Sequence, residues 1–147
     1  MSPVPDYPDT CLDASLIDAY SGTEYRVYGP VPAVLTVNQA SVQLQQLHDH
    51  YGVNCSAFIT ACNPYSQRID DVGNLLRQAS LKQEILEKGY PLLEAVGKDP
   101  QNKWPREPSF LVLGIPQPVA QELGRLFEQN AILYANDDAV PRLLILR

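Results

Sequence analysis

The sequence predicts a single α+β domain, with a mixed or largely antiparallel sheet and about four helices packed on it. Its 147 residues match the size of one ordinary domain. Hydrophobic residues make up 45% of the chain and charged residues 19%, which is enough apolar material for a folded core. Helix-like and strand-like segments follow one another without strict βαβ repetition, and this order favours the α+β class.

The sequence of the N-terminal part predicts an irregular arm, a helix and a hairpin. Residues 1–8 are expected to form an irregular arm because they include three prolines, and residues 9–147 are expected to form the domain. The first helix is expected to begin at residue 9 or 10 and to end at Gly22, since apolar residues recur at helical spacing before this glycine. The segments "TEYRVYG" and "AVLTV", on either side of "GPVP", predict two strands of a hairpin.

A second helix and a buried strand are predicted next. Asn38 is expected to cap a helix that ends at Gly52. Residues 55–62 are apolar at both alternating sets of positions. A strand with two apolar faces is typical of the interior of a sheet that is covered on both sides.

The longest helix is predicted to begin at Asp70 or Asp71 and to end at Gly89. Its apolar residues form two stripes. The tighter stripe, which is expected to face the core, consists of Val72, Leu75, Leu76, Ala79 and Leu86. Leu81 and Ile85 lie on the other side, so this helix, over residues 72–88, could also join the subunits of a homo-oligomer.

The sequence of the C-terminal half predicts four more strands and a helix. "YPLLEAV" and "PSFLVLGI" read as strands on either side of the polar loop "GKDPQNKWPRE", and loops of this length are often functional. The helix starts near Pro116 and Pro118, with Val119, Ala120, Leu123, Leu126 and Phe127 expected to face inward. "AILYA" and "RLLILR" predict a closing hairpin around "NDDAVP".

Charge and hydropathy argue against several function classes. Seventeen acidic and eleven basic residues give a net charge of -6, and the basic residues form no stripe, so no nucleic-acid partner is expected. The longest apolar runs are far shorter than the roughly 20 residues that cross a bilayer, so no membrane is expected either. The first ten residues lack the features of a signal peptide, and a cytoplasmic location is therefore expected.

The sequence contains no motif of a metal site or a cofactor-binding site. Cys11, Cys55 and Cys62 lack a CxxC spacing and are expected to be small buried residues. His48 and His50 point about 200° apart on a helix, so they cannot share a metal ion, and structural roles are favoured. The signatures GxSxG, HExxH and GxGxxG are absent, so we expect neither a cofactor nor a metal.

The first polar cluster is the turn "NPYS", which ends the strand "AFITAC". Asn and Ser are common turn formers, so the simpler interpretation is a corner between two elements. The alternative is that a buried strand presents Asn63, Tyr65 and Ser66 to a ligand at the edge of the sheet.

The second cluster is "KWPREPSF". Glu107 and Ser109 have the same parity on the strand, so both are expected on one side of the sheet. In the structural alternative, Trp104 is a lid on the core and Glu107 pairs with Arg106 or Lys103 at the surface. In the functional one, burial raises the pKa of Glu107 and suits it to act as a general acid or base.

The third cluster is "EQNAILY". Asn130 is expected at the end of a helix, where asparagine tolerates the left-handed conformation. Gln129 has no such structural explanation, and it joins the candidate ligand contacts.

The clusters appear in a recognisable order: "AFITACNPYS", then Asn74 and Arg77, then "WPREPSFLVLGI" and "LGRLFEQNAILY". This pattern resembles the uncharacterised bacterial proteins grouped as domain of unknown function 3293, over the chain from about Ala19 to Leu146. The resemblance implies a small cytosolic bacterial protein. It supplies no activity, substrate or catalytic residue.

The leading hypothesis is a protein that binds a small polar or anionic ligand in a cleft at the sheet edge. Arg77 would bind the anionic group through its planar fork, and Trp104 would stack on the ligand or cover it. The ligand-binding residues in this hypothesis are Asn63, Tyr65, Ser66, Asn74, Arg77, Trp104, Ser109 and Gln129.

Two alternatives come from other function classes. The first is a hydrolase or group-transfer enzyme in which Glu107 is the general acid or base. The second is a protein–protein interaction module that uses Leu81, Ile85 and the acidic surface.

Overall fold

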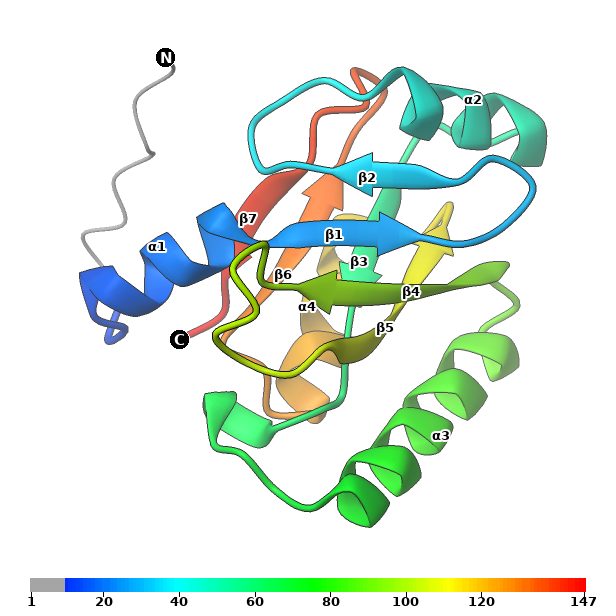
Figure 1. Cartoon of the computed structure of the whole chain (residues 1–147). Coiled ribbons are helices and arrows are strands. Elements are labelled where there is room, and N and C mark those ends of the chain that lie inside the picture. Colours follow the sequence, from blue (N-terminus) through cyan, green and yellow to red (C-terminus); the bar gives the residue numbers. More distant parts are fainter. Residues whose placement is uncertain (1–9) are drawn as a thin grey trace.

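A computed structural model describes residues 10–147, and the predicted arm of residues 1–8 lies outside this range. Within the range, a seven-stranded sheet and four α-helices confirm the α+β class (Figure 1). No helix there is both long and apolar enough to cross a membrane. The elements are α1 (Ala14–Gly22), β1 (Glu24–Val27), β2 (Ala33–Leu35), α2 (Val42–Tyr51), β3 (Ser56–Ile59), the 3₁₀ turn η1 (Pro64–Ser66), α3 (Asp71–Glu87), β4 (Leu92–Lys98), β5 (Glu107–Leu113), α4 (Gln117–Leu126), β6 (Ala131–Ala135) and β7 (Arg142–Ile145).

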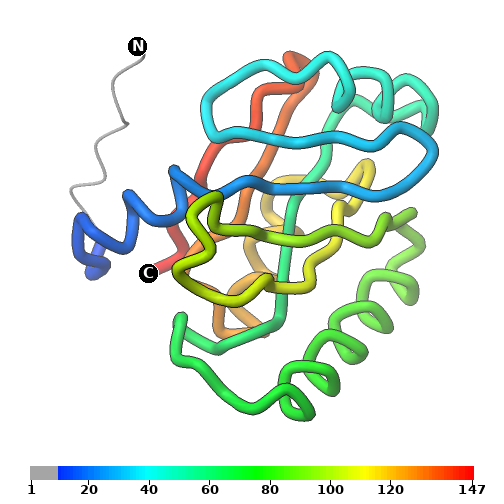
Figure 2. The backbone as a smooth tube through the Cα atoms, viewed as in Figure 1, coloured from blue at the N-terminus to red at the C-terminus, as the bar shows by residue number. Residues whose placement is uncertain are grey.

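The sheet has the strand order β2-β1-β4-β5-β3-β6-β7, and all neighbouring strands are antiparallel. The predicted hairpins β1–β2 and β6–β7 are confirmed, and β4–β5 forms a third. β3 has no hairpin partner and lies between β5 and β6 (Figure 2). The predicted interior strand is therefore confirmed, although it ends at Ile59 and not at Cys62.

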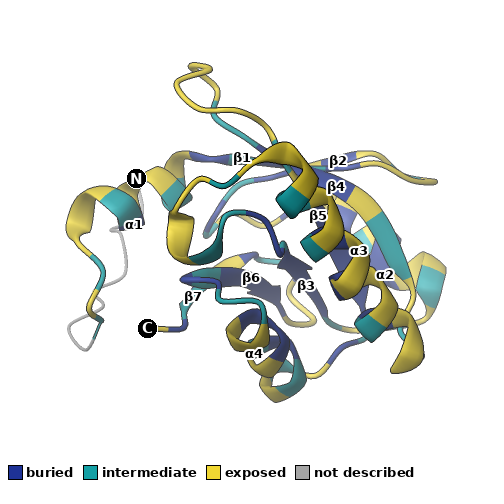
Figure 3. Cartoon of the chain, turned by 90° about the horizontal axis from the view of Figure 1, so that it is seen from below, coloured by how far each residue is buried: buried dark blue, intermediate teal, exposed yellow. Residues whose placement is uncertain are grey.

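Different helices cover the two faces of the sheet. Phe58 of β3 belongs to a core that includes Leu44 and Leu47 of α2. Ala57 and Ile59 belong to a second core, which β3 shares with α3 and α4. Figure 3 shows the buried residues of the strands in dark blue beneath these two helices.

The sheet curls, so residues of its two edge strands meet in the first core. Leu35 of β2 and Leu143 of β7 belong to the same buried cluster. The segments that follow β2 and precede β7 are joined directly, because the Asn38 N–H donates a hydrogen bond of 2.7 Å to the Pro141 carbonyl. We call the face enclosed by this curl the inner face.

The helix ends follow local sequence signals, with two corrections. The first helix, predicted to begin at residue 9 or 10, begins at Ala14, because the Asp13 side chain accepts the capping bond from the Leu16 N–H. The Asp70 side chain caps α3 as predicted, and Gly52 ends α2 with a φ of 65°. The prediction that Asn38 caps α2 is wrong, because the Ser41 side chain accepts the capping bond from the Leu44 N–H. Asn38 instead forms a turn, with a φ of 67°.

The structure reverses the predicted orientation of α3. Leu81 and Ile85 are fully buried, and Gln78 on the same side accepts a hydrogen bond of 3.0 Å from the Ala61 N–H. The stripe predicted for the core faces solvent: Val72, Leu75, Leu76 and Leu86 are between 54% and 71% exposed, and Ala79 is exposed too. Leu81 and Ile85 therefore cannot form the surface of an interaction module. A subunit contact through this helix stays a prediction, and it would use the exposed stripe.

Of three smaller predictions, one is wrong, one is only partly right and one agrees with the structure. Leu126 of α4 is exposed and not buried. Cys11 is exposed and Cys55 is partly exposed, so only Cys62 fits the expected buried cysteine. His48 is buried and lies within hydrogen-bonding distance, 2.8 Å, of the Ser56 hydroxyl, as expected for a structural residue.

Candidate functional site

A cavity of about 570 Å³ opens at one end of the curled sheet, on the inner face. Its walls come from α1, from the segment between β3 and α3, from the loop between β4 and β5, and from the first residues of β5 and β6. In Figure 1, α1, η1 and this loop lie at the same end of the sheet. Mouths of barrel-like sheets are common places for ligand sites.

The cavity exists because the inner face carries small residues at this end. Gly97 and Ala131 line it, and Gly97 lies opposite Glu107 in the β4–β5 register. Deeper in the sheet, Phe58 and Leu133 fill the space and form the cavity floor. The opening is thus lined by polar and small groups, and the floor is apolar.

The turn after β3 has an unusual backbone. Asn63, Tyr65 and Ser66 have φ values of 50°, 51° and 59°, although none of them is glycine. The left-handed region costs a residue such as tyrosine about 1–3 kcal/mol, and such residues concentrate at binding sites. Three of them within four positions favour a site over a plain corner.

A pair of asparagines holds this turn. The Asn63 N–H donates to Asn74 Oδ1, and Asn74 Nδ2 donates to Asn63 Oδ1, both at 2.8 Å. Asn63 Oδ1 also accepts from the Ile69 N–H at 3.2 Å, while Asn63 Nδ2 donates to Glu107 Oε2 at 3.0 Å. The two amides therefore connect β3, α3 and β5 at the cavity wall.

Asn74→Ala is expected to lower the free energy of unfolding by about 1–3 kcal/mol, because the Asn63 N–H loses its partner in a partly buried place. Urea denaturation of the wild type and the variant measures the change. Gln83→Ala, an exposed substitution on the same helix, should change it by about 0.5 kcal/mol or less. Equal losses in the two variants would contradict the structural role of Asn74.

Glu107 is partly buried in the cavity wall, and Asn63 is its hydrogen-bond donor. Within residues 10–147 it forms no ion pair, so the predicted surface pair with Arg106 or Lys103 is wrong. Burial raises the pKa of Glu107, and the bond from Asn63 opposes this shift. Burial also raises the pKa of the neighbouring Cys62 thiol, so the thiol is a poor nucleophile at neutral pH.

Glu107→Gln is expected to stabilise the ligand-free protein at neutral pH. The raised folded-state pKa means that, above pH 4.5, the folded protein holds this proton more tightly than the unfolded chain. The wild type should therefore lose stability as the pH rises from 4.5 through the raised pKa, and the glutamine variant should not show this loss. We expect the variant to melt a few degrees higher at pH 7.5, with the difference shrinking toward pH 4.

Thermal melts at both pH values, with Glu94→Gln as the control, measure this effect. Glu94 is an exposed carboxylate on β4, and it pairs with Lys82 at 3.6 Å. The titratable neighbours of Glu107, Cys62 and Tyr25, both have raised pKa values and stay protonated over this range. A glutamine variant that melts below the wild type at pH 7.5 would count against a destabilised carboxylate.

The other side of the turn is tied to α1 and to the C-terminal residues. The Ser66 hydroxyl lies 2.5 Å from the Tyr20 hydroxyl, and Asn130 Nδ2 donates to both, at 3.1 and 3.2 Å. The Arg147 guanidinium lies over the Tyr65 ring, 4.1 Å from its centroid, and donates to Asn130 Oδ1. Tyr65 thus packs against the C-terminal residue and lies outside the cavity wall.

The segment between α4 and β6 supplies Gln129. Its Nε2 donates to the carbonyls of Cys62 and Phe127, both at 3.1 Å, so it ties this segment to the end of β3. The prediction that Asn130 adopts the left-handed conformation is wrong, because Glu128 does so, with a φ of 58°.

Arg77 lies outside the cavity wall, so its predicted contact with an anionic group is not part of this cavity and stays a prediction. Its Nε donates to the Ala61 carbonyl at 2.7 Å, and its Nη2 donates to the Phe127 carbonyl. Its Nη1 pairs with Glu128 Oε1 at 3.4 Å. The planar fork is therefore occupied by groups of the protein, and Arg77 joins β3 to the end of α4.

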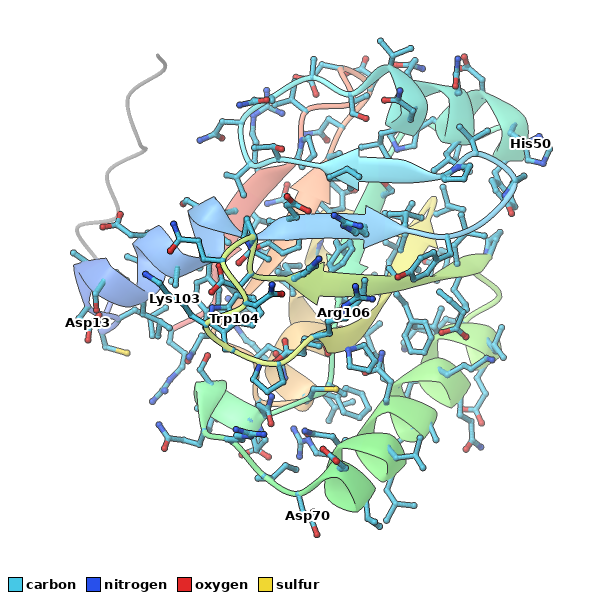
Figure 4. All side chains as sticks on the ribbon, viewed as in Figure 1. Asp13, His50, Asp70, Lys103, Trp104 and Arg106 are labelled. Atoms are coloured by element: carbon cyan, nitrogen blue, oxygen red, sulfur yellow. The ribbon has the colours of Figure 1, made fainter. Side chains whose placement is uncertain are left out.

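The remaining predicted residues meet at the cavity. Those that line it are Asn63, Ser66, Asn74, Trp104, Glu107, Ser109 and Gln129. Ser109 is buried and donates to the Glu107 carbonyl. Trp104 is 37% exposed on the loop between β4 and β5, where Figure 4 shows it together with Lys103 and Arg106.

The sequence reasoning missed two arginines of the cavity lining. Arg68 and Arg106 are exposed, line the cavity and form no ion pair within the described range. Their positions in the sequence indicated a place at the site, because Arg68 follows the "NPYS" turn closely and Arg106 directly precedes Glu107. Tyr20 was also missed, since nothing in a helical pattern indicates its contact with Ser66.

Comparison with known proteins gives one match. The family model described as "Protein of unknown function (DUF3293)" matches residues 59–132, which contain all of the sequence-predicted site residues. No curated protein and no solved structure matches the chain significantly.

Proposed function

The chain belongs to the DUF3293 family of proteins of unknown function, and within it we propose a ligand-binding protein. Its ligand is a small molecule with an apolar body and an anionic group, bound in the cavity at the open end of the sheet. The observation that carries this proposal is the cavity itself, together with the strained turn at its wall.

The lining supports an amphipathic ligand. Tyr25, Phe58 and Leu133 provide an apolar floor, and the amides and hydroxyls lie nearer the opening. The volume of about 570 Å³ falls within the roughly 300–1,000 Å³ of typical small-molecule sites. Trp104 lies at the opening on an exposed loop, where it can stack on a bound molecule.

Arg68 and Arg106 are the residues that would bind the anionic group of the ligand. Both guanidinium groups are exposed at the cavity and have no carboxylate partner among the described residues. An arginine binds a carboxylate or phosphate with two parallel hydrogen bonds, and an unpaired fork is free to do so.

Native mass spectrometry of gently purified protein tests the proposal. We expect a bound small molecule in the wild type, its loss in Ala131→Phe, which fills the cavity, and weaker retention in Arg68→Ala and Arg106→Ala. Arg125→Ala, an exposed arginine on α4 away from the cavity, should retain the ligand. Trp104 is the single tryptophan, so its fluorescence reports rebinding of the extracted compound. A ligand that Ala131→Phe retains would overturn the proposal.

We also propose where such a protein works. Its three cysteines are free, which fits a reducing compartment. Together with the resemblance to bacterial proteins, this supports a location in the bacterial cytosol. Fractionation of the native host with an antibody against the protein would test this location.

A second candidate function is catalysis in the same cavity, with Glu107 as general acid or base. The specific observation in its favour is the raised pKa of this carboxyl, which brings its titration closer to neutral pH. Turnover of the extracted ligand by the wild type, with loss of turnover in Glu107→Gln, would support the enzyme. Bound but unchanged ligand would leave binding as the function.

A further inference from the structure

Among residues 10–147, the carboxylate of Glu107 has no cationic partner. Asn63 Nδ2, a neutral donor, bonds to Oε2 at 3.0 Å. The ion pairs among residues 10–147 join Arg26 to Glu24, Arg77 to Glu128, Lys82 to Glu94, and Arg142 to Asp138. The charge of Glu107 is therefore balanced by no group of the described chain.

A partly buried carboxylate without a cationic partner is costly for the protein. Buried charges in proteins are normally paired or hydrogen-bonded on all sides, because the low-dielectric surroundings favour the neutral form. The cost is consistent with the raised pKa of this carboxyl. It falls when a positive charge approaches, and a ligand in the cavity can supply that charge.

We propose that the ligand carries a protonated amine that binds Glu107, in addition to the anionic group held by Arg68 and Arg106. The ligand class is then a zwitterion with an apolar body, as in an amino acid or a short peptide with an apolar side chain. This inference rests on the proposed function, because it assigns chemistry to the same cavity.

The arrangement of the cavity fits the two charges of such a molecule. Glu107 is partly buried at the start of β5, whereas Arg68 and Arg106 are exposed. The ammonium group therefore enters deeper than the anionic group. Tyr20 and Trp104 also line the cavity, and aromatic rings favour a cation beside a carboxylate.

Three probes with one apolar body test the inference: L-phenylalanine, 3-phenylpropionate, which lacks the amine, and 2-phenylethylamine, which lacks the carboxylate. Their binding is measured by the fluorescence of Trp104, and by NMR shifts at probe concentrations up to the millimolar range. We expect L-phenylalanine to bind roughly 10- to 100-fold more tightly than 3-phenylpropionate, as a charge-assisted bond in a partly buried site implies.

The matched variants separate this inference from the proposed function. Glu107→Gln keeps an acceptor for Asn63 and should abolish the preference for the amine, while Glu94→Gln should preserve it. If 3-phenylpropionate binds as tightly as L-phenylalanine, or if the preference survives in Glu107→Gln, the inference is wrong and the proposed function stands. If none of the probes binds and the purified protein carries no small molecule, both are wrong.

Discussion

Leu81→Ala is expected to lower the free energy of unfolding by about 2–5 kcal/mol, because it removes a fully buried leucine from the core beneath α3. Leu76→Ala, in the same helix, is expected to change it by only about 0.5 kcal/mol, since Leu76 faces solvent. The contrast is large because the two leucines lie on opposite sides of one helix. It tests the orientation of α3 directly.

Urea denaturation of both variants, with the wild type measured in parallel, gives the two values. Ile85→Ala should behave like Leu81→Ala, because Ile85 is buried in the same core. A larger loss for Leu76→Ala than for Leu81→Ala would show that the exposed stripe is buried in solution. A dependence of the Leu76→Ala effect on protein concentration would show that a second copy buries it.

Arg77→Ala is expected to lower the free energy of unfolding by about 2–5 kcal/mol. The carbonyls of Ala61 and Phe127 both accept hydrogen bonds from this guanidinium, and each loses a charged donor in a partly buried place. Arg77→Lys should recover only part of the loss, because an ammonium group cannot reproduce the planar fork.

The matched control is Arg125→Ala, since Arg125 is exposed and makes no side-chain hydrogen bond or ion pair within the described residues. Thermal and urea unfolding of the three variants measure the effect. If Arg77→Ala is as stable as Arg125→Ala but loses the ligand, the sequence-based role in binding is right and the structural role is wrong.

The strands could be predicted because their pattern is local. "AVLTV", "AILYA" and "RLLILR" have the apolar content of strands, and short turns separate the paired ones, so both hairpins followed from the sequence. β3 was recognisable as an interior strand, since Ala57 and Phe58 are apolar on opposite faces. Its neighbours β5 and β6 were not predictable, because they lie far away along the chain.

The orientation of α3 could not be predicted because both of its sides carry large apolar residues. The tighter stripe has more leucines, but the buried side also carries a polar residue, Gln78, whose side chain accepts a hydrogen bond from the Ala61 N–H after β3. Apolar periodicity gives no weight to such a residue. The prediction of the α2 cap was wrong because Asn38 and Ser41 are both good capping residues, and the helix begins directly after Ser41.

Much of the candidate site was found because polar residues gather where strands end. Asn63, Glu107 and Gln129 follow or begin apolar segments, and the curl of the sheet brings them to one cavity. The partner of each polar group was beyond the sequence, because it lies on a distant element. Arg77 illustrates this, since its side chain is equally suited to an anionic ligand and to the backbone carbonyls that it binds.

The insertion of β3 between β5 and β6 has a consequence for the order of folding. The three hairpins join strands that are neighbours along the chain, so they can form quickly, whereas β3 must wait for two strands that are distant in sequence. The cavity wall includes Thr60 after β3, Ser109 of β5 and Ala131 of β6, so it is complete only after β3 has been inserted. If the proposed function is right, the response of Trp104 fluorescence to the ligand should therefore return during refolding later than the secondary structure of the hairpins.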